Sequence, residues 1–328
     1  MLKIPADSKS ALRHTCILFA AALVMLFLWA YLRLPDGNLL IITFTFLAAS
    51  GCADLPSAES QTREIVRMTF CVIILQFTVS ATAHVQLLNM LLPPLTGSVI
   101  LKILPTASAY PVMLSGFMAY PAASGIQAAA GRAADLLIAG APALFISYSA
   151  SRFQTPPSVL NRARHLPDHE VVTTTLAILA ATFLYKFLSM PQGIWIILTV
   201  IFICMAQQPG ERSIELVQQR IFSVPAGIIL GGIYSGSAVM FNYHMVYLAP
   251  LIGAVGFFSL YYRHNFGEFS LYFMFAFTIC ADWLGGYRHG FHFWQLLAAR
   301  SLATLIGAAV LLSAEKIFSY SPSGKSAP

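Results

Sequence analysis

The chain has 328 residues, of which 58% are hydrophobic and 10% are charged, and its mean hydropathy is +0.73. Soluble domains carry about 25% charged residues, so a soluble enzyme, a secreted disulfide scaffold and a disordered chain are excluded. The net charge of +6 comes from basic residues in the loops, which indicates membrane orientation rather than nucleic-acid binding. The composition therefore predicts an all-α polytopic membrane protein.

Apolar runs recur along the whole chain at lengths close to the ~20 residues that a transmembrane helix needs. We predict about 12 transmembrane helices, with the ranges 12–32, 38–53, 65–83, 85–104, 107–127, 133–150, 171–189, 193–207, 221–241, 244–261, 268–284 and 295–314. The first range also resembles a signal peptide, but it is longer than the ~7–15-residue apolar core of such peptides. We therefore expect it to be a membrane helix.

The basic residues favour one orientation of these helices. With the N-terminus in the cytoplasm, 14 of the 19 lysines and arginines fall in inside segments. The others fall outside and are Arg33, Arg132, Lys186, Arg288 and Arg300. This bias predicts a multi-pass protein with both termini in the cytoplasm.

Two parts of the chain resemble each other. Residues 34–43, LPDGNLLIIT, align with residues 190–199, MPQGIWIILT, at an offset of 156. A second match, at an offset of 168, aligns 132–139 with 300–307. Each half holds six predicted helices, so both halves enter the membrane from the same side. This pattern predicts two parallel six-helix repeats related by an axis along the membrane normal.

The predicted organisation is a first six-helix repeat over 1–150, a cytoplasmic linker over 151–170 and a second six-helix repeat over 171–328. The linker is polar, basic and contains prolines, as connecting segments do. Tandem repeats of this kind commonly place a substrate path at the repeat interface, near the bilayer midplane. The organisation favours transport over a repeat that only builds structure.

The second repeat carries a family motif. Its residues are Pro191, Gly193, Trp195, Thr199, Gln208, Pro209 and Arg220. This run resembles the Pro-x-Gly-x-Trp…Thr, Gln-Pro and Arg…Gly pattern of the fusaric acid resistance / aromatic acid exporter family, here as a short form without the large cytoplasmic domain. The terminal run from Arg300 to Gly307 resembles the arginine motif on the last helix of that family.

The resemblance implies an efflux transporter of a bacterial inner membrane that acts on small hydrophobic or aromatic carboxylates and related weak acids. It also implies a periplasmic membrane-fusion adaptor and an outer-membrane channel as partners, and a homo-oligomer is compatible with it. Passive anion channels of related fold and a scaffold without transport stay as alternatives. The sequence holds no nucleotide-binding loop or catalytic motif, so we expect no cofactor, no enzyme activity and a proton-driven mechanism.

Ionisable residues within membrane helices are costly and mark substrate or proton pathways. Arg132 and Asp135 share one helix face, where they form either a pair that a substrate anion opens or a structural pair at a helix end. Arg300 lacks such a neighbour, so Asp282 or an anion is its expected partner. Asp135, Asp282 and Glu268 are the proton-coupling candidates, although Glu268 also suits a simple helix start.

Four further residues are candidates for substrate binding or translocation. Thr43 and Thr199, at matching depths, either bind the substrate or bond back to their own helices. Trp195 either stacks on an aromatic substrate or packs within the bundle. Arg220 either takes part in gating or in binding the incoming anion, or it anchors a helix end at the cytoplasmic surface. The two Pro-x-Gly breaks either expose helix amides to an anion or form tight turns, and no metal site is expected.

Overall fold

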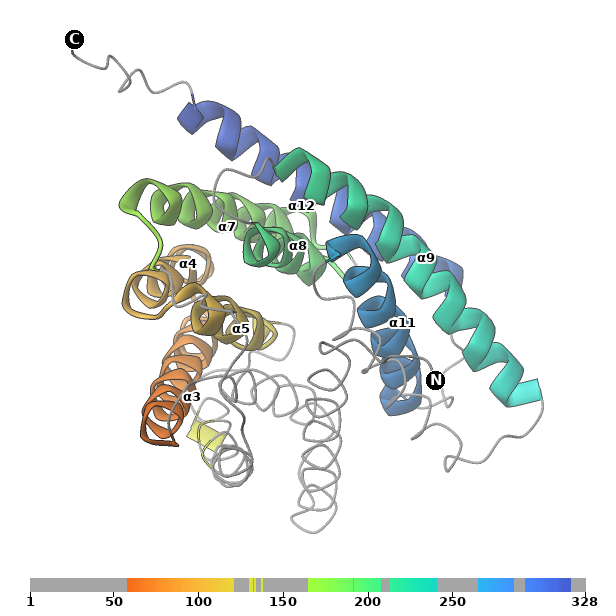
Figure 1. The fold of residues 1–328 in the computed structure, drawn as a ribbon, viewed down its shortest axis with the longest axis horizontal. Helices are drawn as coiled ribbons and strands as arrows, with labels where there is room; N and C mark the ends of the chain where they lie inside the picture. The colour runs from red at the N-terminus through yellow and green to blue at the C-terminus, as the bar shows by residue number, and fades with distance from the viewer. Residues whose placement is uncertain are drawn as a thin grey trace, which may run out of the picture.

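The computed structural model describes most of the second half of the chain and part of the first. The described residues are 58–120, 165–190, 192–207, 213–240, 265–285 and 293–319, with a few residues of 130–137. Their helices are α3 (Ala58–Ala81), α4 (Gln86–Ile103), α5 (Thr106–Phe117), α7 (Asp168–Leu188), α8 (Ile194–Ala206), α9 (Ser213–Met240), α11 (Phe266–Gly285) and α12 (Phe293–Ser319) (Figure 1). No strand occurs in these segments, which confirms the predicted all-α class.

Five of the described helices are long and apolar enough to cross a membrane. These spans comprise the whole of α4 and α7 and parts of α3, α9 and α12. These helices also present large apolar side chains on the outside of the bundle, such as Phe70, Phe187 and Phe222. Such a surface suits contact with lipid, because a bilayer solvates apolar groups. The helices support a multi-pass membrane protein.

Each described helix overlaps one of the predicted ranges. The ranges 12–32, 38–53 and 244–261 lie outside the described residues, and 133–150 lies almost wholly outside them. The count of twelve helices and the arrangement as two repeats therefore stay predictions.

The start of α9 was predicted wrongly. The helix begins at Ser213, well before the predicted 221. Its first two turns are amphipathic, with Leu216 and Val217 buried and Glu215 and Gln218 exposed. A hydropathy criterion misses such a segment because its polar face lowers the mean. Arg220 therefore lies inside a helix and not in a loop.

Four further helix ends differ from the predicted ones by three residues or more. α3 begins at Ala58 and not at 65, and α12 ends at Ser319 and not at 314. α7 begins at Asp168, inside the predicted linker, because Pro167 precedes it and two acidic residues in its first turn favour the helix dipole. α5 ends at Phe117, ten residues before the predicted 127. Tyr120 precedes a proline, and a residue in that position disfavours the helical conformation.

α8 is the innermost of the described helices. It contacts α5, α7, α9 and α12, and its residues Ile194–Cys204 are all buried. Thirteen residues make a helix ~20 Å long, which is shorter than the ~30 Å hydrocarbon core. α8 is thus a short apolar helix enclosed by protein.

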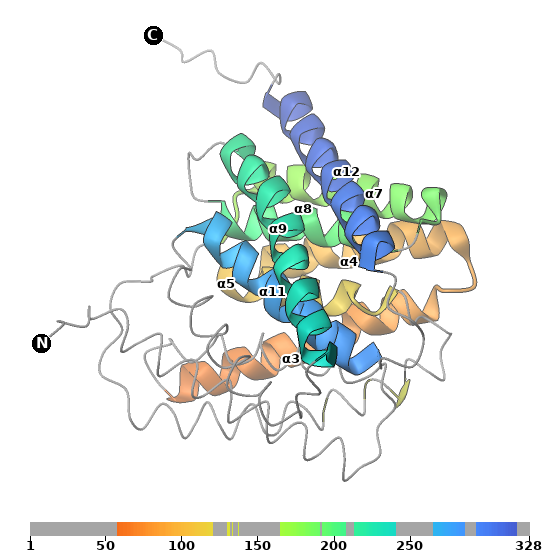
Figure 2. The same cartoon turned by 90° about the vertical axis from the view of Figure 1, so that its right-hand side faces the viewer.

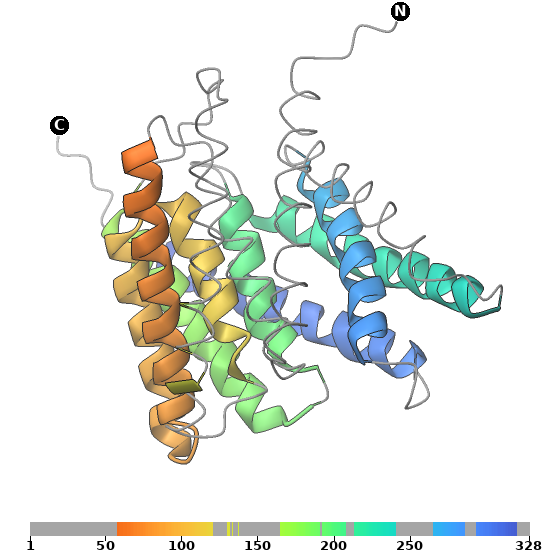
Figure 3. The same ribbon diagram turned by 90° about the horizontal axis from the view of Figure 1, so that it is seen from below.

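α9 and α11 pack closely, as Figure 2 shows. A Cβ atom added at Gly227 would lie 2.6 Å from the carbonyl oxygen of Leu271, and one at Gly231 would lie 2.8 Å from Cβ of Thr278. Small residues four apart allow such close contact between membrane helices. Figure 3 shows α3, α4 and α5 side by side on the other side of the molecule.

Candidate functional site

Two arginines lie inside the bundle. Arg220 of α9 is 0% exposed and Arg300 of α12 is 3% exposed. Burying a charged side chain is costly unless another group compensates the charge. Within the described residues, no carboxylate lies within salt-bridge distance of Arg220, and the ion pairs Arg63–Glu59 and Lys102–Asp168 are both on the surface. The burial of Arg220 thus needs another explanation.

Arg220 contacts neutral groups. Its Nη1 donates a hydrogen bond to Oγ of Ser270 at 2.5 Å, and its Nη2 lies 4.0 Å from Sδ of Met274. Its guanidinium carbon lies 4.5 Å from the ring centroid of Phe202. Its buried Nε has no hydrogen-bond partner in the part of the chain that the structure describes.

One edge of the Arg220 guanidinium group has no oxygen acceptor among the described residues. Nε and Nη2 point in the same direction, and a carboxylate binds this edge through two parallel hydrogen bonds. Among the described residues, no oxygen atom accepts a hydrogen bond from either nitrogen. The geometry is therefore that of a carboxylate-binding group to which the described residues supply no carboxylate.

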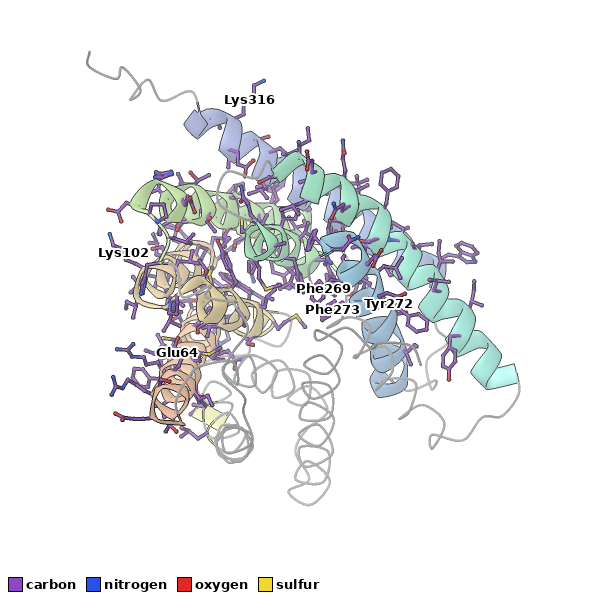
Figure 4. All side chains as sticks on the ribbon, viewed as in Figure 1. Glu64, Lys102, Phe269, Tyr272, Phe273 and Lys316 are labelled. Atoms are coloured by element: carbon purple, nitrogen blue, oxygen red, sulfur yellow. The ribbon has the colours of Figure 1, made fainter. Side chains whose placement is uncertain are left out.

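Hydroxyls and aromatic rings surround this arginine. Ser223 donates a hydrogen bond to Oγ of Ser270 at 2.7 Å, next to Arg220. The rings of Phe202 and Phe273 lie 5.1 Å apart, and Phe269 stacks on Phe273. Figure 4 labels Phe269 and Phe273 on α11, at the end of that helix nearest α8. In such a dry environment, attraction between an arginine and an anion is stronger than in water.

Arg300 forms a second arginine–aromatic pair on α8. Its guanidinium carbon lies 4.9 Å from the ring centroid of Trp195, within the range of a cation–π interaction. The indole nitrogen of Trp195 donates a hydrogen bond to Oε1 of Gln192 at 3.3 Å, which orients the ring. Because α12 begins at Phe293, Arg300 lies two turns inside the helix and not at its start.

The two arginine–aromatic pairs share one face of α8. Trp195, Thr199 and Phe202 are spaced four and three residues apart, so they lie in one row. The hydroxyl of Thr199 is buried and has no hydrogen-bond partner in the described segments. It does not bond back to its own helix, which was one of the two alternatives for this residue.

Gln192 and Gly193 of the Pro-x-Gly break form a tight turn before α8. Ser189 and Gln192 both have positive φ angles, of 44° and 60°. The N–H groups of Gly193 and Trp195 donate hydrogen bonds to the carbonyls of Met190 and Gln192, each at 3.0 Å. These amides are therefore already used within the turn, which supports the tight-turn alternative over an anion site at the helix start.

The structure brings together four of the predicted residues, Arg220, Arg300, Trp195 and Thr199, along α8. The side chain of Arg220 is fully buried, which disfavours the alternative that it anchors a helix end at the membrane surface. Glu268 is exposed in the first turn of α11. The remaining predicted residues lie outside the described residues or have undescribed side chains, and they are Thr43, Arg132, Asp135 and Asp282.

The sequence analysis missed Glu64. This residue of α3 is 9% exposed, and its Oε1 has no hydrogen-bond partner among the described residues. Met68, Val72 and Leu75 follow at helical spacing and are buried, so Glu64 begins an apolar face. This helical spacing of Glu64 with apolar residues is the sequence pattern that could have identified it as buried. Figure 4 places Glu64 on α3, away from Phe269 and Phe273.

Comparison with known proteins gives one match. No curated protein and no solved structure is similar to the chain at a significant level. A family described as fusaric acid resistance protein-like matches residues 179–314, which include α8, α9, α11 and nearly all of α12. The motif around Pro191 and the two arginines lie in this region. The match confirms the predicted resemblance: residues 179–314 are similar to the fusaric acid resistance protein-like family.

Proposed function

We propose that the chain is an inner-membrane efflux transporter for small hydrophobic anions, such as aromatic carboxylates and related weak acids. The observation that carries this proposal is the buried Nε–Nη2 edge of Arg220, to which no described residue supplies an oxygen acceptor. A carboxylate on that edge compensates the charge and completes two hydrogen bonds. Phe202 and Phe273 offer ring faces beside it for an aromatic substrate.

The position of α8 supports the same proposal. In transporters built from repeats, short hydrophobic segments interrupted by glycine or proline, at matching places of the two halves, indicate the binding site. α8 is such a segment, and the range 38–53 is its predicted counterpart. In the second half α9 packs on α11, and in the first half α3 packs on α5, as two related repeats require.

Carrier-type transport is favoured over a passive channel by the burial of both arginines. In a continuously open anion channel, cations that line the path are in contact with water. Arg220 and Arg300 are both closed off from solvent, as binding groups are in an occluded state between two open states. A scaffold without transport is the remaining alternative. A scaffold would not explain why the Nε–Nη2 edge of Arg220 is buried without an oxygen acceptor from the described residues.

The proposal includes proton coupling, a periplasmic membrane-fusion adaptor and an outer-membrane channel, with both termini in the cytoplasm.

Glu64 joins Asp135, Asp282 and Glu268 as a proton-coupling candidate, because a buried carboxyl in a membrane helix suits a proton relay. Near it on α3, Arg63 and Arg67 are exposed, and Arg63 pairs with Glu59. Cys71 lies near Glu64 on the same helix.

Uptake of radiolabelled 4-hydroxybenzoate into inside-out vesicles, with and without a pH gradient, tests the proposed function. We expect gradient-dependent uptake by the wild type and reduced uptake by Arg300→Ala and Asp135→Asn. Flux that does not need the gradient would favour a channel. A protein that assembles with an adaptor but gives no flux with it for a panel of aromatic and aliphatic carboxylates would favour a scaffold.

Replacing Glu64 with glutamine is expected to uncouple uptake from the pH gradient. Glutamine keeps the size of the side chain but cannot carry a proton between the two sides of the membrane. We expect the stimulation of uptake by the gradient to fall by about tenfold or more, as for loss of a positioned acid–base group. Glu59→Gln is the matched control, because Glu59 is exposed on the same helix. Full gradient stimulation in Glu64→Gln would exclude Glu64 as the coupling residue.

A further inference from the structure

Two buried hydroxyl groups lie beside a close contact between α8 and α12. A Cβ atom added at Gly307 would lie 2.5 Å from the carbonyl oxygen of Ile196 and 3.0 Å from Cβ of Thr199. Thr304 lies one turn before Gly307 on the same face of α12. Thr199 is 0% exposed and Thr304 is 1% exposed, so both side chains are buried beside this contact.

Neither hydroxyl has a hydrogen-bond partner within the described residues. Other buried threonines in the bundle do: Thr182 donates to the carbonyl of Ile178 at 2.8 Å, and Thr278 donates to the carbonyl of Met274 at 2.7 Å. A carbonyl four residues earlier is available to any threonine in a helix. Thr199 and Thr304 are thus the exceptions, and a buried hydroxyl without a partner is costly.

The two threonines lie between the two arginine–aromatic pairs. Along α8, Thr199 is ~6 Å beyond Trp195 and ~4.5 Å before Phe202, at a rise of 1.5 Å per residue. Arg300 lies against Trp195 and Arg220 lies against Phe202. On α12, Thr304 is one turn beyond Arg300. The hydroxyls therefore occupy the interval between the two cations.

We propose that Thr199 and Thr304 form a relay that donates hydrogen bonds to a carboxylate as it moves between Arg220 and Arg300. This inference rests on the proposed transport of small anions. The two aromatic rings are ~10 Å apart along α8, and an anion crossing that interval between apolar side chains would lose its hydrogen bonds. The two hydroxyls, one from α8 and one from α12, lie between the two arginines. They donate hydrogen bonds to the carboxylate after it leaves one arginine and before it binds the other. Their role is to lower the barrier of transfer and not to hold the substrate.

The relay predicts that removing one of the two hydroxyls lowers the rate of transport but leaves the affinity for the substrate unchanged. Thr199→Val keeps the volume and removes the hydroxyl. We expect the maximal rate of 4-hydroxybenzoate uptake into proteoliposomes to fall by about tenfold, the effect of one lost hydrogen bond to a charged group. The equilibrium Kd of the purified full-length protein should stay within about twofold, because both arginines are kept. Thr199→Ser should restore the rate.

Matched variants separate a relay from a packing effect. Thr304→Val removes the second hydroxyl from the other helix and should lower the rate in the same way, which also covers the case that Thr199→Val fails to assemble. Thr182→Val is the control, because Thr182 is equally buried but bonds to its own helix. Its rate should equal that of the wild type.

Three results would overturn the relay. Wild-type rates in both Thr199→Val and Thr304→Val would show that the hydroxyls have no part in transfer. A raised Kd at an unchanged maximal rate would make them part of a static binding site. Absence of uptake by the wild-type protein, assembled with an adaptor and given the panel of carboxylates, would refute the proposed function and the relay together. The first two results leave the proposed function intact.

Discussion

Replacing Arg220 with methionine is expected to abolish transport while leaving the fold as stable as that of the wild type or more so. The wild-type protein buries this cation among a hydroxyl, a thioether and a phenyl ring, without a carboxylate from the described residues. Removing an uncompensated buried charge relieves a desolvation cost of several kcal/mol. Removing the partner of a bound anion costs about 3–5 kcal/mol, or a factor of about 100 to 1,000 or more in affinity.

The two effects are measured separately. Apparent Tm in detergent reports stability, and binding and uptake of 4-hydroxybenzoate report function. Arg220→Lys is the matched variant, since lysine keeps the charge and loses the two-nitrogen edge, so we expect weak but measurable uptake. If Arg220→Met lowered the apparent Tm strongly, the arginine would be a structural group held by Ser270. If it kept full uptake, the anion site would lie elsewhere.

The helices were largely predictable because hydropathy reports directly which segments a bilayer or a bundle interior accepts. α4 and α8 agree with their predicted ranges to within one residue. The first two turns of α9 were missed because half of their residues are polar and exposed. Arg220 was for this reason placed in a loop. A search for helical periodicity, in addition to mean hydropathy, would have extended the helix to Ser213.

The candidate site was predictable residue by residue but not as an arrangement. Trp195, Thr199, Arg220 and Arg300 stood out because they are polar or aromatic residues in motif positions. Which arginine meets which ring depends on the register of α9 and α12 against α8. Close contacts at residues such as Gly307 set this register. The unpartnered state of the Thr199 hydroxyl depends on a side-chain rotamer, which sequence spacing does not determine.

Gly307→Val is expected to separate α12 from α8 and to impair both stability and transport. The added Cβ would lie 2.5 Å from a backbone carbonyl oxygen, that of Ile196, so no side-chain movement can relieve the clash. Overpacking of this kind typically costs about 1–3 kcal/mol. Arg300 is on the same face of α12 two turns earlier, so the displacement also moves its guanidinium group away from the Trp195 ring.

Gly267→Val separates this packing effect from the general effect of valine in a helix. Gly267 lies in the first turn of α11, and a Cβ there would make ordinary contacts of 3.5 Å with Asn265 and Gln219. We expect Gly307→Val to lower the apparent Tm and to reduce uptake by about tenfold or more, whereas Gly267→Val should leave both near the wild type. Equal behaviour of the two variants would show that the contact of α12 with α8 at Gly307 is loose. In that case Trp195 and Arg300 would not be held together by this packing.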